Sequence, residues 1–181
     1  MSAMTLDQLK RRPTFHVAPR DTITLLGLFA PAALFGLGLL WVGLHDPRFG
    51  WALAPLSWPW ELGVMAACGA IGTVGGVCDW TFHRLYVTVG PKEHHSHKLA
   101  LLTGGLPLFL LMAVASVISA PRALLLPVMV VGLYTTALIC YDEFVFHLRR
   151  CTAIETLFHR LLVFGNGAAW LAWCHFCFVR G

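Results

Sequence analysis

The sequence predicts an all-α polytopic membrane protein with five transmembrane helices, of which helices 2–5 form a four-helix bundle. Three observations predict this fold. Hydrophobic residues make up 57% of the chain and charged residues only 12%, with a mean hydropathy of +0.71, whereas about a quarter of the residues in soluble domains are charged. The apolar residues fall into five runs, each long enough to cross a hydrocarbon core of about 30 Å. Because 181 residues leave little room for a soluble domain, we expect one transmembrane domain over residues 1–181.

The first apolar run spans residues 22–44 and follows a basic N-terminal stretch. This order is also found in secretory signal peptides, but the run is too long for a signal h-region and no small-residue cleavage site follows it. We therefore interpret it as the first transmembrane helix. It lacks the acid and histidine pairs of the later segments, so we place it at the periphery of the bundle. The proline- and tryptophan-rich stretch after it suits a membrane surface.

Four further apolar runs follow, and we interpret each as a membrane-spanning helix. Breaks near Gly90-Pro91, Ala120-Pro121 and Arg149-Arg150 separate them. Because these connections are short, consecutive helices should be antiparallel neighbours. The predicted spans are residues 60–86, 93–119, 122–147 and 153–178.

The basic residues indicate the orientation of the chain. If the N-terminus is cytoplasmic, only Arg48, Arg122 and Arg180 of the 13 Lys and Arg residues fall on the opposite side. This bias is typical of the positive-inside rule, and we expect a bacterial inner (plasma) membrane location with the N-terminus in the cytoplasm. The net charge of +4 thus reports topology, and it gives no support for nucleic-acid binding.

An acidic residue followed four positions later by a histidine occurs four times in the last four segments. Residues four apart share one helix face, so each copy presents a carboxylate beside an imidazole. The copies lie at helix ends that should all be cytoplasmic, and they form an internal repeat of two hairpins with one pair on each arm. The predicted metal ligands are Asp79, His83, Glu93, His97, Glu143, His147, Glu155 and His159.

Four carboxylates in one membrane layer require neutralisation, since a single charge at the bilayer centre costs about 2.5–3.5 kcal/mol on insertion scales. Two divalent cations would balance four carboxylates and leave the histidines as neutral nitrogen donors. The repeat therefore predicts a dinuclear metal centre. Mixed carboxylate and imidazole ligands suit iron, with zinc or manganese as alternatives. Soluble di-iron carboxylate proteins use comparable ligands with Glu-x-x-His pairs on facing helices, but the longer spacing here makes the parallel chemical rather than familial.

One such pair alone at a helix end is more often an ion pair or a cap than a ligand set, and only its repetition in one layer favours a metal. His94 could replace or supplement His97. Asp142 could be the ligand in place of Glu143, or could hold a ligating histidine in position. The other candidates near the layer are Tyr141 and Asn166.

These features predict a non-haem di-iron oxidase or oxygenase that acts on a hydrophobic substrate from the cytoplasmic leaflet, with no protein nucleophile besides the metal ligands. It would need an external electron donor, because the chain has no room for a flavin or ferredoxin domain. One alternative is a dizinc hydrolase of a lipid ester, amide or phosphate with Asp142 as base. A second is a metal-ion transporter. Exposed apolar surface on so small a bundle also allows a homo-oligomer or a partner subunit.

Overall fold

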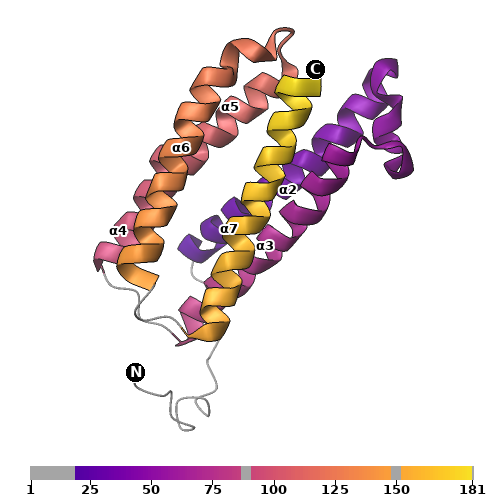
Figure 1. The fold of residues 1–181 in the computed structure, drawn as a ribbon. Coiled ribbons are helices and arrows are strands. Elements are labelled where there is room, and N and C mark those ends of the chain that lie inside the picture. The colour runs from indigo at the N-terminus through magenta and orange to yellow at the C-terminus, as the bar shows by residue number, and fades with distance from the viewer. Residues whose placement is uncertain (1–18, 87–90, 148–151, 181) are drawn as a thin grey trace.

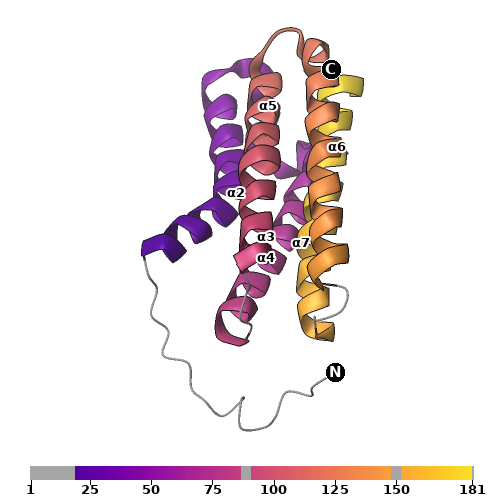
Figure 2. The same cartoon turned by 90° about the vertical axis from the view of Figure 1, so that its left-hand side faces the viewer.

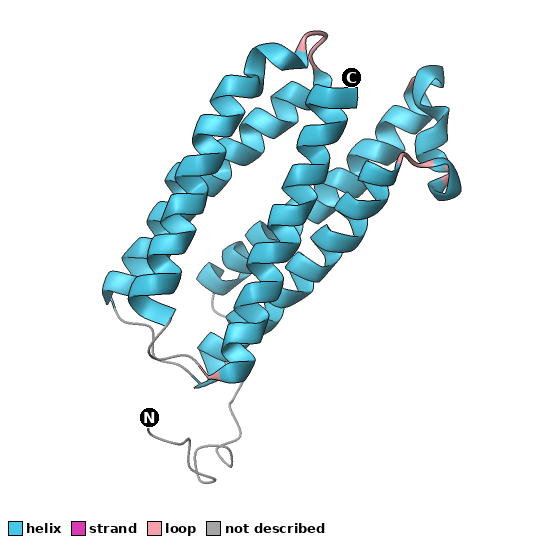
Figure 3. Ribbon diagram, viewed as in Figure 1, coloured by secondary structure: helices cyan, strands magenta, loops and turns pink. Residues whose placement is uncertain are grey.

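The computed structural model describes residues 19–86, 91–147 and 152–180, and these residues are helical apart from short connections, with no strand among them (Figure 3). The first half of the described chain contains α2 (Pro19–His45), two short 3-10 segments (Pro47–Leu53 and Pro55–Ser57) and α3 (Trp60–Tyr86).

Each of the three helical rods that follow combines an α-helix with a π-helical segment. In the first rod, α4 (Pro91–Leu99) continues through the π-helical segment Ala100–Gly105 into α5 (Leu106–Val117). In the second, α6 (Leu125–Asp142) follows a 3-10 turn (Pro121–Leu124) and continues into the π-helical segment Glu143–His147. In the third, α7 (Ala153–Cys174) continues into the π-helical segment His175–Arg180.

Four helical stretches are long and apolar enough to cross a membrane, which identifies an integral membrane protein. Within the described residues α2 adds a shorter apolar stretch, Phe29–His45. The prediction of an all-helical membrane chain with five helices is therefore confirmed. The four stretches are Trp60–Leu85, His95–Val117, Pro121–Phe146 and Ala153–Arg180.

Glycines decide which helices pack most closely. A Cβ on Gly165 of α7 would lie 2.7 Å from the Gly72 nitrogen and 2.8 Å from the Cys68 carbonyl oxygen of α3. A Cβ on Gly75 would lie 2.7 Å from the Leu162 nitrogen. Small residues at such positions let two helix backbones approach each other inside a membrane, so α3 and α7 form the most extensive helix contact.

The second close pair joins α4 and α5 to α6, where Gly104 lies against Thr135. The closest packing thus joins the first helix of the four to the last, and the two middle helices to each other (Figures 1 and 2). The expected repeat of two hairpins, each made of consecutive helices, is not seen as a pair of packing units. Facing glycines bring α3 and α7 together although the two helices are distant in sequence, whereas α5 and α6 are also joined by a short connection.

An apolar core fills the space between the two pairs at the end where α5 stops and α6 begins. Its buried residues include Ala115, Val128, Trp173 and Phe178. The Trp173 indole nitrogen donates a hydrogen bond of 3.0 Å to the Ser116 hydroxyl, so the polar edge of this large side chain is satisfied within the apolar surroundings.

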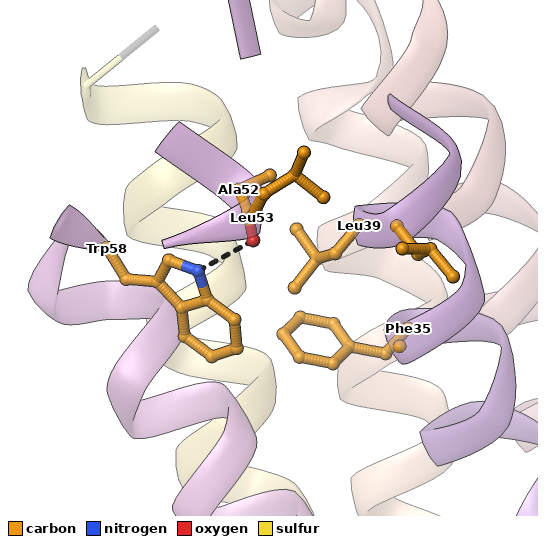
Figure 4. A pocket seen from close by; sticks show the side chains of 7 residues that line it. Phe35, Leu39, Ala52, Leu53 and Trp58 are labelled. Atoms are coloured by element: carbon orange, nitrogen blue, oxygen red, sulfur yellow. Dashed lines mark hydrogen bonds between the residues drawn. The ribbon is translucent and has the colours of Figure 1, made fainter. Parts of the chain in front are cut away.

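Helix α2 lies outside the other four and contacts α3 and the segment Pro47–Leu53 (Figure 1). That segment folds back so that the Trp58 indole donates to the Ala52 carbonyl at 3.0 Å, and the Trp58 ring meets Phe35 edge to face. Figure 4 shows the resulting apolar groove of about 380 Å³, which Leu39 and Leu53 also line. Because its walls are apolar, this groove suits contact with lipid acyl chains rather than a catalytic role.

The glycine contact between α3 and α7 is testable with two alanine substitutions in one helix. Gly165→Ala should destabilise the protein by about 1–3 kcal/mol, because the new methyl group overpacks against the α3 backbone. Gly167→Ala meets nothing within 4 Å and should be neutral or slightly stabilising, since alanine is the better helix former. Thermal unfolding of both variants in one detergent measures the difference, and equal melting temperatures would refute the close contact.

Candidate metal centre

The end of the bundle opposite the apolar core brings together the last turn of α3, the first turns of α4 and α7, and the segment Glu143–His147 (Figures 1 and 2). These are the chain segments that carry the acid and histidine pairs. Three carboxylates here are nearly inaccessible to solvent: Glu93 is 3% exposed, Asp142 4% and Glu155 3%. Buried carboxylates of this kind require a charge partner.

His83 connects α3 to α7. Its Nε2 atom lies 3.2 Å from Glu155 Oε1. Its Nδ1 atom lies 3.0 Å from the Asp79 carbonyl oxygen and 3.5 Å from the Asp79 carboxylate. One imidazole ring therefore faces a carboxylate from its own helix and another from the neighbouring helix.

The carboxylate of Glu155 is fixed by the start of α7. Its Oε2 atom accepts a hydrogen bond from the Thr152 backbone N–H at 3.1 Å, and the Thr152 hydroxyl accepts one from the Glu155 backbone N–H at 3.3 Å. This capping box satisfies two N–H groups at the helix start. One carboxylate oxygen thus caps the helix, and the other is held toward His83.

Asp142 and Glu143 are adjacent in sequence but contact different helices. Asp142 Oδ2 lies 2.9 Å from His97 Nε2 of α4, whereas Glu143 Oε2 lies 3.3 Å from His159 Nε2 of α7. The side chains of consecutive helical residues point about 100° apart, so Asp142 and Glu143 can face two different neighbouring helices. The π-helical segment begins at Glu143, and π-bulges of this kind are frequent at functional sites.

The contacts combine into one layer across the bundle. The rings of His83 and His97 lie 6.5 Å apart between centroids and nearly perpendicular to each other, which brings the His83 contacts near the His97–Asp142 pair. We call this set the carboxylate–histidine layer. These contacts join Asp79, His83, His97, Asp142, Glu143, Glu155 and His159. We also include Glu93, because it is buried and lies one helical turn before His97 on α4.

Six of the eight predicted ligands take part in these contacts, most of them with different partners from those the spacing indicates. Asp79 and His83 keep the contact within one helix. His97, Glu155 and His159 instead face partners on neighbouring helices. The side chains of His94 and His147 lie outside the described residues.

Two further candidates take other positions. Tyr141 is 54% exposed, and its ring packs against Phe146 on the outer surface of the bundle. The Asn166 amide donates to the Leu162 carbonyl of its own helix at 2.8 Å and lies against Gly72 of α3. We therefore assign Asn166 to helix packing.

Polar atoms of this layer are withdrawn from solvent. They include Asp79 Oδ1, Asp142 Oδ1 and Glu143 Oε2, together with both ring nitrogens of His159. Asp79 Oδ1 accepts no hydrogen bond from the described residues, and its nearest basic group is His83 Nδ1 in an ion-pair contact at 3.5 Å. A buried oxygen in this state is costly unless a cation or a proton reaches it.

The donor types fit a metal ion, although the described side chains stand in pairs. No group of three or more described His, Cys, Asp or Glu side chains is arranged to hold a metal. The pair distances of 2.9–3.3 Å between nitrogen and oxygen are those of hydrogen bonds. Two ligands at about 2.1 Å from one metal would also lie about 3.0–3.4 Å apart at bond angles of about 90–109°. Recruitment of a third ligand would require a side-chain rotation.

A second buried carboxylate, which the sequence reasoning missed, lies at the other end of the bundle. Glu61 is 1% exposed, and its two oxygens lie 2.9 Å from His175 Nδ1 and 2.9 Å from an Arg180 guanidinium nitrogen. In the sequence, two features point to this contact: Glu61 lies in the first turn of an apolar helix, and basic residues lie at the end of the last helix, α7. These partners give Glu61 a cation from the chain itself.

The chain matches no protein-family model, no curated protein and no solved structure. The chemistry of the carboxylate–histidine layer therefore carries the functional proposal.

The assignment of the two adjacent acids to different histidines is testable by double-mutant cycles. Asp142→Asn and His97→Gln should be non-additive in unfolding free energy by about 0.5–3 kcal/mol, because the two side chains are in direct contact. Glu143→Gln and His159→Gln should couple in the same way. Asp142→Asn combined with His159→Gln is the comparison cycle and should show a clearly smaller coupling. Equal coupling in all three cycles would contradict the assignment.

Proposed function

We propose that the carboxylate–histidine layer binds two divalent metal ions, and that the protein is a membrane-bound non-haem di-iron oxidase or oxygenase. The observation that supports this proposal most strongly is the set of cross-helix contacts His83–Glu155, His97–Asp142 and His159–Glu143. They draw on four helices and fall in one largely buried layer. Helix packing alone does not require so many ionisable side chains at one depth.

The charge balance supports two ions rather than one. The layer contains five carboxylates, and one divalent ion would leave three of them uncompensated. Two divalent ions leave a single negative charge, which one protonated histidine would balance. Glu61 shows the contrasting case in the same molecule, where Arg180 and His175 satisfy a lone buried carboxylate. The five carboxylates are Asp79, Glu93, Asp142, Glu143 and Glu155.

Iron is the metal that this ligand set favours. Carboxylate and imidazole donors together suit iron, manganese and zinc, and di-iron carboxylate proteins place such donors on facing helices of a bundle. The reaction would insert one atom of O₂ into a C–H bond and release the other as water, with two electrons and two protons from an external reductant. The positive-inside bias supports an orientation with this layer at the cytoplasmic side of a bacterial inner membrane, which is part of the proposal.

Two alternatives receive less support from the contacts. A dizinc hydrolase would use Asp142 as a base, but this carboxylate is engaged with His97 at 2.9 Å. A metal-ion transporter would need polar side chains along a path through the membrane. The core between the helix pairs consists instead of apolar residues such as Val128 and Phe178.

Metal content tests the proposal directly. Protein purified without added metal from iron-replete cells should contain about two iron ions per chain by elemental analysis. Glu155→Gln or His83→Gln should remove at least one of them, because each removes a charge or a donor from the layer. Glu61→Gln is the matched control, a buried carboxylate outside the layer, and it should retain both ions.

The oxygen response separates the metals. Anaerobically reduced protein should react with O₂ and change its visible absorption if the ions are iron. Two zinc ions and no response to O₂ would refute the oxidase and favour the hydrolase. Failure to bind any metal after reconstitution, in protein that remains folded by circular dichroism, would refute the centre itself.

A further inference from the structure

A groove of about 640 Å³ opens on the outer surface of the bundle beside the carboxylate–histidine layer. This volume falls in the range of small-molecule sites, about 300–1,000 Å³. Its walls come from α4 and from α6 with its π-helical extension. The lining residues are Lys92, His95, Ser96, Leu99, Leu138, Tyr141 and Phe146.

The groove and the layer occupy adjacent faces of the same helices. Lys92, Ser96 and Leu99 fall at helical spacings that share one face of α4, and Glu93 and His97 each follow one position later. Successive residues differ by about 100° around a helix. A molecule in the groove would therefore lie against the outer side of the helix that carries Glu93 and His97.

On the second wall, formed by α6, a groove residue is likewise followed by a residue of the carboxylate–histidine layer. Tyr141 lines the groove, whereas Asp142, the next residue, faces His97 at 2.9 Å. The side chain of His97 is 38% exposed, whereas the side chain of Asp142 is only 6% exposed. The imidazole is thus the accessible member of this pair.

Polarity changes along the groove. Lys92 and His95 lie near the start of α4, and Leu99 lies deeper along the helix axis, by about 10 Å from Lys92 and about 6 Å from His95 at 1.5 Å per residue. On the antiparallel wall Leu138 lies on the deeper side of Tyr141. None of the lining residues is acidic, and the hydroxyl groups of Ser96 and Tyr141 supply hydrogen-bond donors. The polar end would attract an anion, and the deeper end would accept an apolar chain.

We propose that this groove binds a single-chain amphiphile with an anionic head group, with its head at Lys92 and His95 and its chain between Leu99 and Leu138. This inference deepens the proposed function, on which it rests, by naming the substrate class: an anionic, long-chain molecule delivered from the bilayer.

Photolabelling of metal-free protein in a neutral detergent tests the groove. The probe is a twelve-carbon carboxylate with a diazirine at the end of its chain, and peptide mass spectrometry locates the label. We expect labelling at Leu99 and Leu138, and at least tenfold weaker labelling of Lys92→Glu. Lys98→Glu, an exposed α4 position that does not line the groove, should label like the unmodified protein.

A second pair of variants tests the apolar end. Leu138→Trp should fill the groove and abolish labelling, whereas Leu133→Trp on the exposed surface of α6 should not change it. Dodecanoate should displace the probe, and dodecyltrimethylammonium should not. Label spread over exposed leucines of all helices, or equal displacement by both amphiphiles, would overturn the proposal.

The absence of metal from the labelling experiment keeps the two proposals separable. If the protein fails to bind metal on reconstitution but still shows specific labelling, the groove is supported and the oxidase is refuted. Two bound iron ions without specific labelling would support the metal centre and refute this substrate class.

Discussion

The burial of several carboxylates at one end of a membrane-embedded bundle is the constraint on which the rest of this structure depends. Glu93, Asp142 and Glu155 are each less than 5% exposed. A carboxylate in such surroundings without a partner either raises its pKa and becomes protonated, or destabilises the fold. Histidines from neighbouring helices face two of these carboxylates. Protons or metal ions can complete the neutralisation, and the number of carboxylates favours metal ions.

The two ends of the bundle neutralise buried acid in different ways. At one end the chain brings its own cation to Glu61, because His175 and Arg180 extend from α7 in a π-helical segment. The bonding of residues five apart in such a segment helps both side chains to reach one carboxylate. A second π-helical segment starts at Glu143 and a third shortly after His97. Each local change of helical register thus lies beside a buried acid or its partner.

The sequence was sufficient for the helices and for the contact between Asp79 and His83, because both depend on local properties. Apolar length defines a membrane-spanning helix, and the four-residue spacing places Asp79 beside His83. It was not sufficient for helix pairing, which depends on where Gly72 and Gly165 of distant segments meet. The role of Glu61 was hidden for the same reason, since it depends on partners from another helix. The spacing offered one acid of the Asp142-Glu143 pair as a ligand, whereas the structure turns both toward histidines.

The proposed function requires two metal ions close together in the carboxylate–histidine layer. X-ray absorption spectroscopy at the iron edge of the purified protein tests it most directly. A dinuclear centre gives a shell of nitrogen and oxygen ligands at about 2.0–2.2 Å and a second metal at about 3.5–4 Å. Sulfur ligands at about 2.3 Å, or a spectrum without a neighbouring metal in protein that contains two iron ions per chain, would contradict it.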